Sequence, residues 1–401
     1  GYGNRIRAKY TAKWGVQIVG MIFQTRSSTI TGKDTNHMSQ SSFGNKFKVT
    51  TWGESHGKAL GAVVDGCPAG LPLCEEDIQK FLDRRKPGQS RYTTARKEGD
   101  LVEILSGVFE SKTTGTPISL MVRNTDQRSR DYGNIAYSYR PGHADYTFDQ
   151  KYGFRDYRGG GRSSGRETIG RVAAGAIASK ILEELGISIC TYTRSIGPVE
   201  IASFNKEEIH QNAFYMPDAQ AAVKAGEYLE ECMKNQDSAG GVIECRITGT
   251  PAGLGEPVFD TLSALLAHAL MSIGAVKAVE IGDGIEVSSR KGSENNDAFC
   301  IKDGQVSKKT NHAGGILGGI SDGSPVLLRA HIKHIAPDFQ PQQTIGRDHM
   351  ERTLQIKGRH DPVIVPRAVV VVESMTALTI LDLMLSNMGA RMDHLEKIYT
   401  K

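Results

Sequence analysis

The distribution of apolar side chains along the chain predicts short strands and amphipathic helices that alternate irregularly. Alternating or short apolar runs predict strands at 47–51, 60–65, 101–109, 117–122, 187–194, 241–248, 276–287, 324–334 and 368–372. Helical spacing predicts helices at 75–85, 167–185, 218–235, about 258–271 and 374–388, with Gly186 and Gly389 as stop signals. Because strands and helices do not follow a regular βαβ rhythm, the predicted class is α+β with mostly antiparallel sheet.

One stretch of about 40 residues, 124–165, has no such periodicity. It is rich in Gly, Arg, Tyr and Asp. Loops of this length are usually functional or disordered. The aromatic and specific polar content favours a functional loop.

A short repeat bears on domain organisation. GCPAGL at 66–71 and GTPAGL at 249–254 each follow a predicted strand and precede a predicted helix. Two related halves would explain the repeat, and so would a common turn composition with Pro and Gly. No Pro/Ser-rich linker divides the chain, so we expect residues 38–401 to form a single domain with two pseudo-related halves.

The first 37 residues differ from the rest, since no acidic residue precedes Asp34. This composition resembles a transit peptide, and equally a vector-derived leader or translated upstream sequence, with Met38 as a native start. We therefore expect residues 1–37 to be a leader outside the fold.

Composition and charge narrow the functional class. The chain is 39% hydrophobic and 23% charged, which fits a soluble globular protein, and its net charge is only +4. Basic runs at 78–97 and 140–171 favour small anionic ligands over a nucleic-acid track. No apolar run approaches the roughly 18 residues of a membrane span. Scattered cysteines without a C-x-x-C pair predict no metal site and a reducing, cytoplasmic location.

The run YRGGGRSSGRETIGR at 157–171 precedes the strongest predicted helix. It is not a Walker A loop, because no G-K-[ST] follows the glycines, and it is not a dinucleotide fingerprint. Glycine backbone, two serine hydroxyls and several arginines at a helix start are typical of an anion site. A flexible glycine turn with an ordinary serine cap is the alternative.

Other polar motifs share this character. WGESHG at 52–57 places Ser55 beside His56, and RPGHADYTFDQKYG presents His143 after a Pro-Gly turn. Histidine exchanges protons near neutral pH. Ordinary surface or structural histidines remain the alternative. Asp361 in KGRHDPVIVPR could be a base, an orienting group or a turn starter, and Arg85 and Arg91 flank another Pro-Gly turn. Together these motifs predict a site for a polyanionic small molecule and a phosphorylated cofactor.

Several long motifs, from about Phe43 to Leu385, closely resemble those of chorismate synthases. They are GESHGKALGAVVDGCPAGLPL, RPGHADYTFDQKYGFRDYRGGGRSSGRETIGRVAAGAIA, NHAGGILGGISDG and GRHDPVIVPRAV. The resemblance implies a β-α-β sandwich, usually assembled as a homotetramer. It also implies the 1,4-anti elimination of phosphate from 5-enolpyruvylshikimate 3-phosphate, with reduced FMN required although there is no net redox change.

The resemblance also implies roles for individual residues. His56 would protonate the leaving phosphate, and His143 would protonate reduced flavin. Because neighbouring arginines lower the pKa of an imidazole and bound phosphate raises it, His56 itself is expected to be protonated mainly when substrate is bound. Asp361 would relay a proton with Ser55 and Ser164. Flavin-binding positions of the family fall on Arg162, Ser163, Ser164, Gly274, Ala275, Gly314, Lys333 and Arg359. Positions for phosphate or nucleotide contact fall on Arg85 and Arg91.

One segment departs from the family pattern. Where the family usually carries K-P-T-x-S, this chain has KHIAPDF at 333–339, which keeps Lys333 but lacks the hydroxyls. Flavin contacts there are therefore expected to be weaker or differently arranged. A flavin-using reductase and an RNA-binding or anion-binding module are the rival functions. The resemblance leaves open whether NADPH reduces the flavin on this chain or an external flavin reductase supplies it.

Overall fold

The computed structural model describes residues 41–88, 92, 99–124, 136–335, 341–355 and 361–400. Residues Phe43–Lys401 form one compact unit, and Gly1–Ser42 form a separate one. All of the expected leader, 1–37, lies outside the described residues. The fold is that of the unit Phe43–Lys401.

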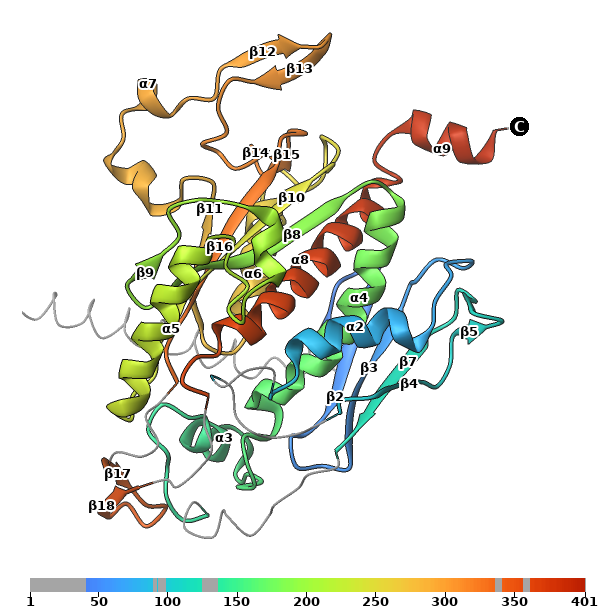
Figure 1. Cartoon of the computed structure of the whole chain (residues 1–401). Coiled ribbons are helices and arrows are strands. Elements are labelled where there is room, and N and C mark those ends of the chain that lie inside the picture. Colours follow the sequence, from blue (N-terminus) through green and yellow to red (C-terminus); the bar gives the residue numbers. More distant parts are fainter. Residues whose placement is uncertain are drawn as a thin grey trace, which may run out of the picture. The chain divides into compact units, whose positions relative to one another are not determined.

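Two antiparallel sheets form the framework of this unit (Figure 1). In spatial order, the strands of the first sheet are β1 (Ser42–Phe43), β2 (Lys48–Gly53), β3 (Ala59–Asp65), β7 (Ile118–Arg123) and β4 (Val102–Ile104). The strands of the second are β11 (Val276–Ile281), β16 (Val326–Ile332), β10 (Gly241–Thr248), β8 (Ser188–Ile196) and β9 (Val199–Glu200). Two-stranded hairpins are formed by β5 (Val108–Phe109) with β6 (Lys112–Thr113), β12 (Phe299–Lys302) with β13 (Gln305–Lys308), β14 (Ile316–Leu317) with β15 (Ile320–Ser321), and β17 (Gln342–Ile345) with β18 (Glu351–Leu354).

Some of the helices lie between the two sheets, and the others lie outside them (Figure 1). The α-helices are α2 (Glu75–Arg85), α3 (Asp145–Tyr152), α4 (Thr168–Glu184), α5 (Ala219–Lys234), α6 (Leu262–Met271), α7 (Gly292–Asn295), α8 (Val365–Asn387) and α9 (Met392–Tyr399). The short 3₁₀ helices are η3 (Gly161–Ser163), η4 (Gly165–Glu167), η5 (Lys206–His210) and η6 (Gly284–Ser289). Helix α4 packs on β2, β3 and β7, and α8 packs on β8 and β10, while α4 and α8 pack on each other. The expected α+β sandwich is confirmed.

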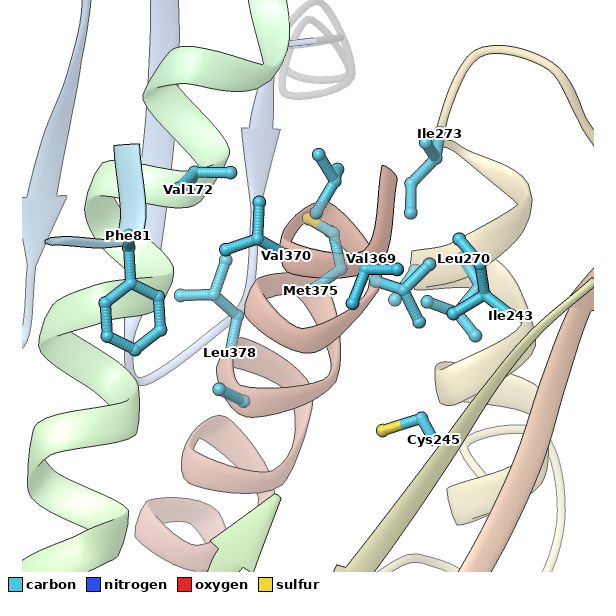
Figure 2. Close-up of a cluster of buried hydrophobic side chains, with 14 of the residues drawn as sticks. Phe81, Val172, Ile243, Cys245, Leu270, Ile273, Val369, Val370, Met375 and Leu378 are labelled. Carbon is cyan, nitrogen blue, oxygen red and sulfur yellow. The ribbon is translucent and has the colours of Figure 1, made fainter. Parts of the chain in front are cut away.

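The core lies on both sides of α8, as Figure 2 shows. Val370 and Leu378 of α8 face Phe81 of α2 and Val172 of α4. On the other side of the helix, buried side chains from α6 and β10 join the same cluster. Burial of a large aliphatic side chain contributes about 1.5–3 kcal/mol, so this cluster holds the two sheets on one helical layer.

Helix α8 differs most from the sequence-based expectation. The run 368–372 was expected to be a strand, yet it lies inside the 23-residue α8. Its valines are β-branched and mimic a strand pattern, but contacts on both sides of the helix override that preference. By length and composition α8 could also cross a membrane, contrary to the expectation that no apolar run is long enough, but 83% of its apolar window is buried inside the fold.

Three smaller differences concern element ends and one missed helix. Strand β11 stops at Ile281 and is followed by η6, although the apolar run continued to Val287. Helix α6 starts only at Leu262, where Thr261 caps it through the backbone N–H of Ala264. Helix α3 lies inside the stretch that showed no periodicity. The two PAGL turns do lie between a strand and a helix, β3–α2 and β10–α6.

The crossing of α4 and α8 depends on Gly175. A Cβ atom on Gly175 would lie 2.2 Å from Cβ and 2.6 Å from Cα of Ser374. We expect Gly175→Ala to lower the free energy of unfolding by about 1–3 kcal/mol, because overpacking outweighs the helix-propensity gain of about 1 kcal/mol. Urea denaturation measures the change. Gly292→Ala at the start of α7, where a Cβ meets nothing within 4 Å, is the control; an equal loss in both variants would contradict the packing argument.

Candidate active site

Ser55 and His56 lie in the turn that joins β2 to β3. The turn is closed by a hydrogen bond from the backbone N–H of Gly57 to the carbonyl of Glu54, 3.0 Å. Ser55 is buried, and its Oγ lies 3.2 Å from Nδ1 of His56. On a strand, adjacent side chains would point to opposite faces. The turn is what allows the two to meet.

The glycine-rich run lies directly against this turn. Gly159 has φ +74°, and a Cβ there would lie 2.5 Å from Cε1 and Nδ1 of His56. Arg140 Nη2 donates to the carbonyl of Gly159 over 2.9 Å. Only glycine allows the backbone to come this close to the imidazole, so the run forms one wall around His56.

The rest of the run winds into the two short turns η3 and η4. The Ser164 side chain caps η4 by accepting from the backbone N–H of Arg166, 3.3 Å. Ser163 is exposed and its Oγ donates to the carbonyl of Gly160, 2.6 Å. Arg162 donates to Oγ1 of Thr51, 2.7 Å, and to the backbone carbonyls of β2. Thus Arg162 anchors the run on β2, while Ser163 faces outward.

A buried cluster of ion pairs is hydrogen-bonded to the glycine-rich run. The Arg85 side chain is 2% exposed, and its Nη2 donates to Oδ2 of Asp100 over 2.6 Å. Its Nη1 donates to the carbonyl of Gly165, 3.2 Å. Asp100 also pairs with Arg166, 3.2 Å. Burial lowers the pKa of Arg85, and the charge of Asp100 opposes that effect.

Asp361 is buried at the start of the segment that leads into α8. It accepts a hydrogen bond from Nη1 of Arg367, 2.5 Å, and Arg367 Nε donates to the backbone carbonyl of Arg85, 3.0 Å. Asp361 is therefore joined to the Arg85 cluster through Arg367. The structure does not describe Arg91 and Arg359, two of the expected binding residues.

A second set of expected flavin residues lies at the start of β11. The backbone N–H of Lys333 donates to the carbonyl of Ala275, 2.9 Å, and Ala275 has φ +74°. A Cβ on Gly274 would meet nothing within 4 Å, so the backbone there is open to a ligand.

Arg171 links this loop to the glycine-rich run. It donates to Ser272, 2.6 Å, and to Glu167, 2.8 Å, and Glu167 accepts from Thr51 and lies 3.7 Å from Arg162. The structure therefore brings 162–164, 274–275 and the His56 turn into one connected region.

Gly314 lies elsewhere. A Cβ on Gly314 would lie 2.5 Å from the backbone nitrogen of Gly282, and its carbonyl accepts from Leu327. Gly282 follows the last residue of β11, whereas Ala275 precedes the first. At about 3.3 Å per residue, the two ends of this six-residue strand are about 17 Å apart. Within one chain, Gly314 is not part of the region around Ala275.

His143 is exposed, in the turn before α3. Its backbone N–H donates to the carbonyl of Arg140, 3.2 Å. Arg140 in turn pairs with the buried carboxylate of Asp145, 2.8 Å, and Arg155 lies 3.5 Å from the same group. Burial alone would raise the pKa of Asp145, but the hydrogen bonds from Arg140 and the charge of Arg155 outweigh it and hold the pKa below its usual value. These ion pairs fix the turn that carries His143.

Asp156 supplies a negative charge near His56. Hydrogen bonds from Arg158 hold the pKa of Asp156 below its usual value, and the positive form of His56 contributes in the same direction. Asp156 is therefore held as an anion three residues before Gly159, whose backbone lies against the His56 ring.

Sequence reasoning missed several residues of this region. Asp100, Asn124 and Asp156 were not singled out, although Asn124 opens the stretch marked as a functional loop. Arg166 was expected to make charge-assisted hydrogen bonds to a bound anion, and Arg171 was noticed only as part of the basic run. The structure gives them partners in Asp100, Glu167 and Ser272. No local pattern signals Asp100, because its partners are brought to it by the fold.

Comparison with known proteins identifies the family of this chain. A family model for chorismate synthase matches residues 47–385. The chorismate synthase of Agathobacter rectalis is 64% identical over 366 residues, which cover 91% of this chain and 100% of that protein. The chain belongs to the chorismate synthase family.

More distant members of the family also match most of the chain. The chorismate synthase of Chloroflexus aurantiacus is 52% identical over 355 residues, which cover 88% of this chain and 98% of that protein. A crystal structure of a chorismate synthase superposes with a TM-score of 0.70 at 32% identity and covers 88% of this chain and 96% of that one. Residues 1–36 match a separate family of unknown function. As a member of the chorismate synthase family, the chain is a carbon–oxygen lyase that acts on phosphates. The family belongs to aromatic amino-acid biosynthesis.

Proposed function

We propose that this chain eliminates phosphate from 5-enolpyruvylshikimate 3-phosphate to give chorismate, the last common step of the shikimate pathway. Phosphate and a hydrogen leave from 1,4-related carbons of the ring on opposite faces, and the ring gains a second double bond. The observation that carries the proposal is the His56 turn against Gly159, with arginines on the surrounding loops. A phosphate leaving group needs such neutralisation as its negative charge develops.

His56 is proposed to donate the proton to the departing phosphate. Its Nδ1 lies 3.2 Å from the Ser55 hydroxyl, which orients the ring. Ser55, Ser164 and Asp361 are proposed to relay a proton on the other side of the reaction. Arg85 and Arg166, being buried with Asp100, are proposed to hold the glycine-rich run in place, whereas Arg91 is proposed to contact phosphate or nucleotide directly.

The residues of the connected region fit a reduced FMN. Ser163 presents an exposed hydroxyl, the backbone at Gly274 is open, and the backbone of Lys333 is hydrogen-bonded to Ala275. Ser163, Ser164, Gly274, Ala275 and Lys333 are therefore proposed to hold the cofactor. Arg162 is proposed to act by anchoring the run, and Arg359 by direct contact. When bound, reduced FMN supplies an electron-rich ring system next to the substrate.

The proposed assembly follows the family. Residues 38–401 are proposed to act as one domain with two related halves, assembled as a cytoplasmic homotetramer. In such an assembly Gly314 would contribute to flavin binding from a copy other than the one that supplies Ala275. The reductant is proposed to be NADPH, used by this chain or by an external flavin reductase. Turnover with NADPH and FMN, but without dithionite or added reductase, separates the two.

Phosphate release from 5-enolpyruvylshikimate 3-phosphate under anaerobic conditions tests the proposed reaction. With dithionite-reduced FMN we expect release together with chorismate absorbance, and with oxidised FMN none. Release that does not depend on reduced flavin would contradict the proposal. Retention of RNA on a filter without any phosphate release would instead favour a binding module.

His143→Ala is expected to lower kcat by about a hundredfold while the affinity for the substrate is kept. This is the lower end of the range for a general acid or base of about 10²–10⁴, because the exposed turn admits solvent that partly replaces the imidazole. Steady-state kinetics at saturating reduced FMN measure the loss, and added imidazole should restore part of it. Near-normal turnover without imidazole would rule out the role.

A further inference from the structure

Asn124 connects the His56 turn to the buried arginine cluster. It follows β7, and its backbone N–H donates to the carbonyl of Lys58, 3.1 Å, just beyond the turn. Its side-chain Nδ2 donates to the carbonyl of Glu54, 3.2 Å, and to the carbonyl of Gly57, 2.8 Å. These two carbonyls flank Ser55 and His56, so one amide group holds both ends of the turn.

The oxygen of the same amide faces Arg166. Oδ1 of Asn124 accepts from Nε of Arg166, 3.1 Å, and from Nη2, 2.7 Å. Arg166 is buried and pairs with Asp100. A guanidinium only donates, and a backbone carbonyl only accepts. Only an amide with its oxygen toward Arg166 and its nitrogen toward the turn satisfies all four hydrogen bonds.

We propose that Asn124 is a positioning residue that sets the His56 imidazole relative to the glycine-rich run by tying the His56 turn to Arg166. The backbone N–H of Arg166 donates to the hydroxyl of Ser164 in the glycine-rich run. Arg166 therefore belongs both to the run and to the buried arginine cluster. Asn124 therefore links the proton donor to the wall that faces it. The proposal rests on the proposed function, in which His56 is the donor.

Asn124→Asp is the sharpest test because it keeps the shape and the acceptor for Arg166. It replaces only the donating nitrogen, and the new oxygen faces two carbonyl oxygens. We expect kcat to fall about tenfold to a hundredfold, since small misplacement of a reacting group costs up to about 10². The KM for 5-enolpyruvylshikimate 3-phosphate should stay within about threefold.

Asn212→Asp is the matched control. Asn212, before α5, uses its Nδ2 to donate to the carbonyls of Glu208, 2.9 Å, and Met216, 2.8 Å, and its Oδ1 to accept from two backbone N–H groups. The same chemical change is therefore made in a turn outside the site. This variant should lose thermal stability but keep the wild-type kcat.

Nitrogen-15 NMR of the imidazoles, recorded without substrate or flavin, provides a readout independent of turnover. The His56 signals should shift or broaden in Asn124→Asp and stay unchanged in Asn212→Asp. If Asn124→Asp folds poorly, Asn124→Ser can be used in its place, because it removes the amide without adding a charge. It should give the same change in the His56 signals. Unchanged His56 signals, or a kcat loss no larger than in Asn212→Asp, would overturn the proposal. If wild-type protein releases no phosphate, the proposed function fails, while the NMR comparison still decides the role of Asn124.

Discussion

Replacement of His56 by glutamine is expected to lower kcat for phosphate release by about 10²–10⁴, the usual contribution of a general acid. Glutamine keeps a hydrogen-bonding group near Ser55 Oγ, which lies 3.2 Å from Nδ1 in the native site, but it cannot deliver a proton. Substrate binding should change little, because the arginines of the site remain. Anaerobic phosphate release with reduced FMN measures kcat and KM separately.

The pH dependence gives a second signature of the same role. A proton donor must carry its proton, so wild-type kcat should fall as pH rises through the pKa of the donor in the substrate complex. His56→Gln should lack this decline at high pH. His394→Gln, on α9, is the matched control and should keep both the rate and the profile. If His56→Gln keeps the wild-type decline, another group is the donor.

Asp100→Asn is expected to lower the free energy of unfolding by about 3 kcal/mol. The side chains of Arg85 and Asp100 are 2% and 1% exposed, and Arg166 pairs with the same carboxylate. Removal of one partner of a buried ion pair leaves the other charge uncompensated, which costs about 3–5 kcal/mol. Because the side-chain oxygen of the new asparagine still accepts a hydrogen bond, we expect a loss at the lower end of this range. Asparagine also tolerates the φ of +42° found at Asp100.

Chemical denaturation of Asp100→Asn measures this loss, and Glu103→Gln is its control. Glu103 pairs with Arg123 over 2.8 Å, but the two side chains are 44% and 66% exposed. Exposed pairs contribute about 0–1 kcal/mol. If Asp100→Asn and Glu103→Gln lower the free energy of unfolding by similar amounts, burial does not make the Asp100 ion pairs more stabilising than exposed ones.

Local sequence patterns were sufficient where an element is stabilised by its own residues. Helix α2 and strand β10 have the predicted bounds, Glu75–Arg85 and Gly241–Thr248. Helix α5 begins after Asp218, whose carboxylate caps it through two backbone N–H groups. Caps, stop signals and periodicity act within a few residues, so they are readable from the chain alone.

Tertiary contacts decided the elements where those patterns were misleading. The valine run before Ser374 is helical because α8 is surrounded by α4, α6 and two strands of the second sheet. Helix α3 has little apolar periodicity, and its buried residues are Asp145 and Asp149. Its position depends on arginine partners at 140, 155 and 347. Ion pairs at irregular sequence separations, of 5, 6 and 198 residues here, leave no periodic signal.

The sequence by itself determined which residue types are present for the chemistry: His56, His143, Ser164 and the arginines of the glycine-rich run, in the order typical of the family. Only the tertiary structure decided that Gly159 lies against the His56 ring and that Asn124 joins the His56 turn to Arg166. It also decided that Gly314 and Ala275 lie at opposite ends of β11. Proton-transfer and charge effects depend on distances of a few ångströms, and those distances arise only when the two sheets close on the helices between them.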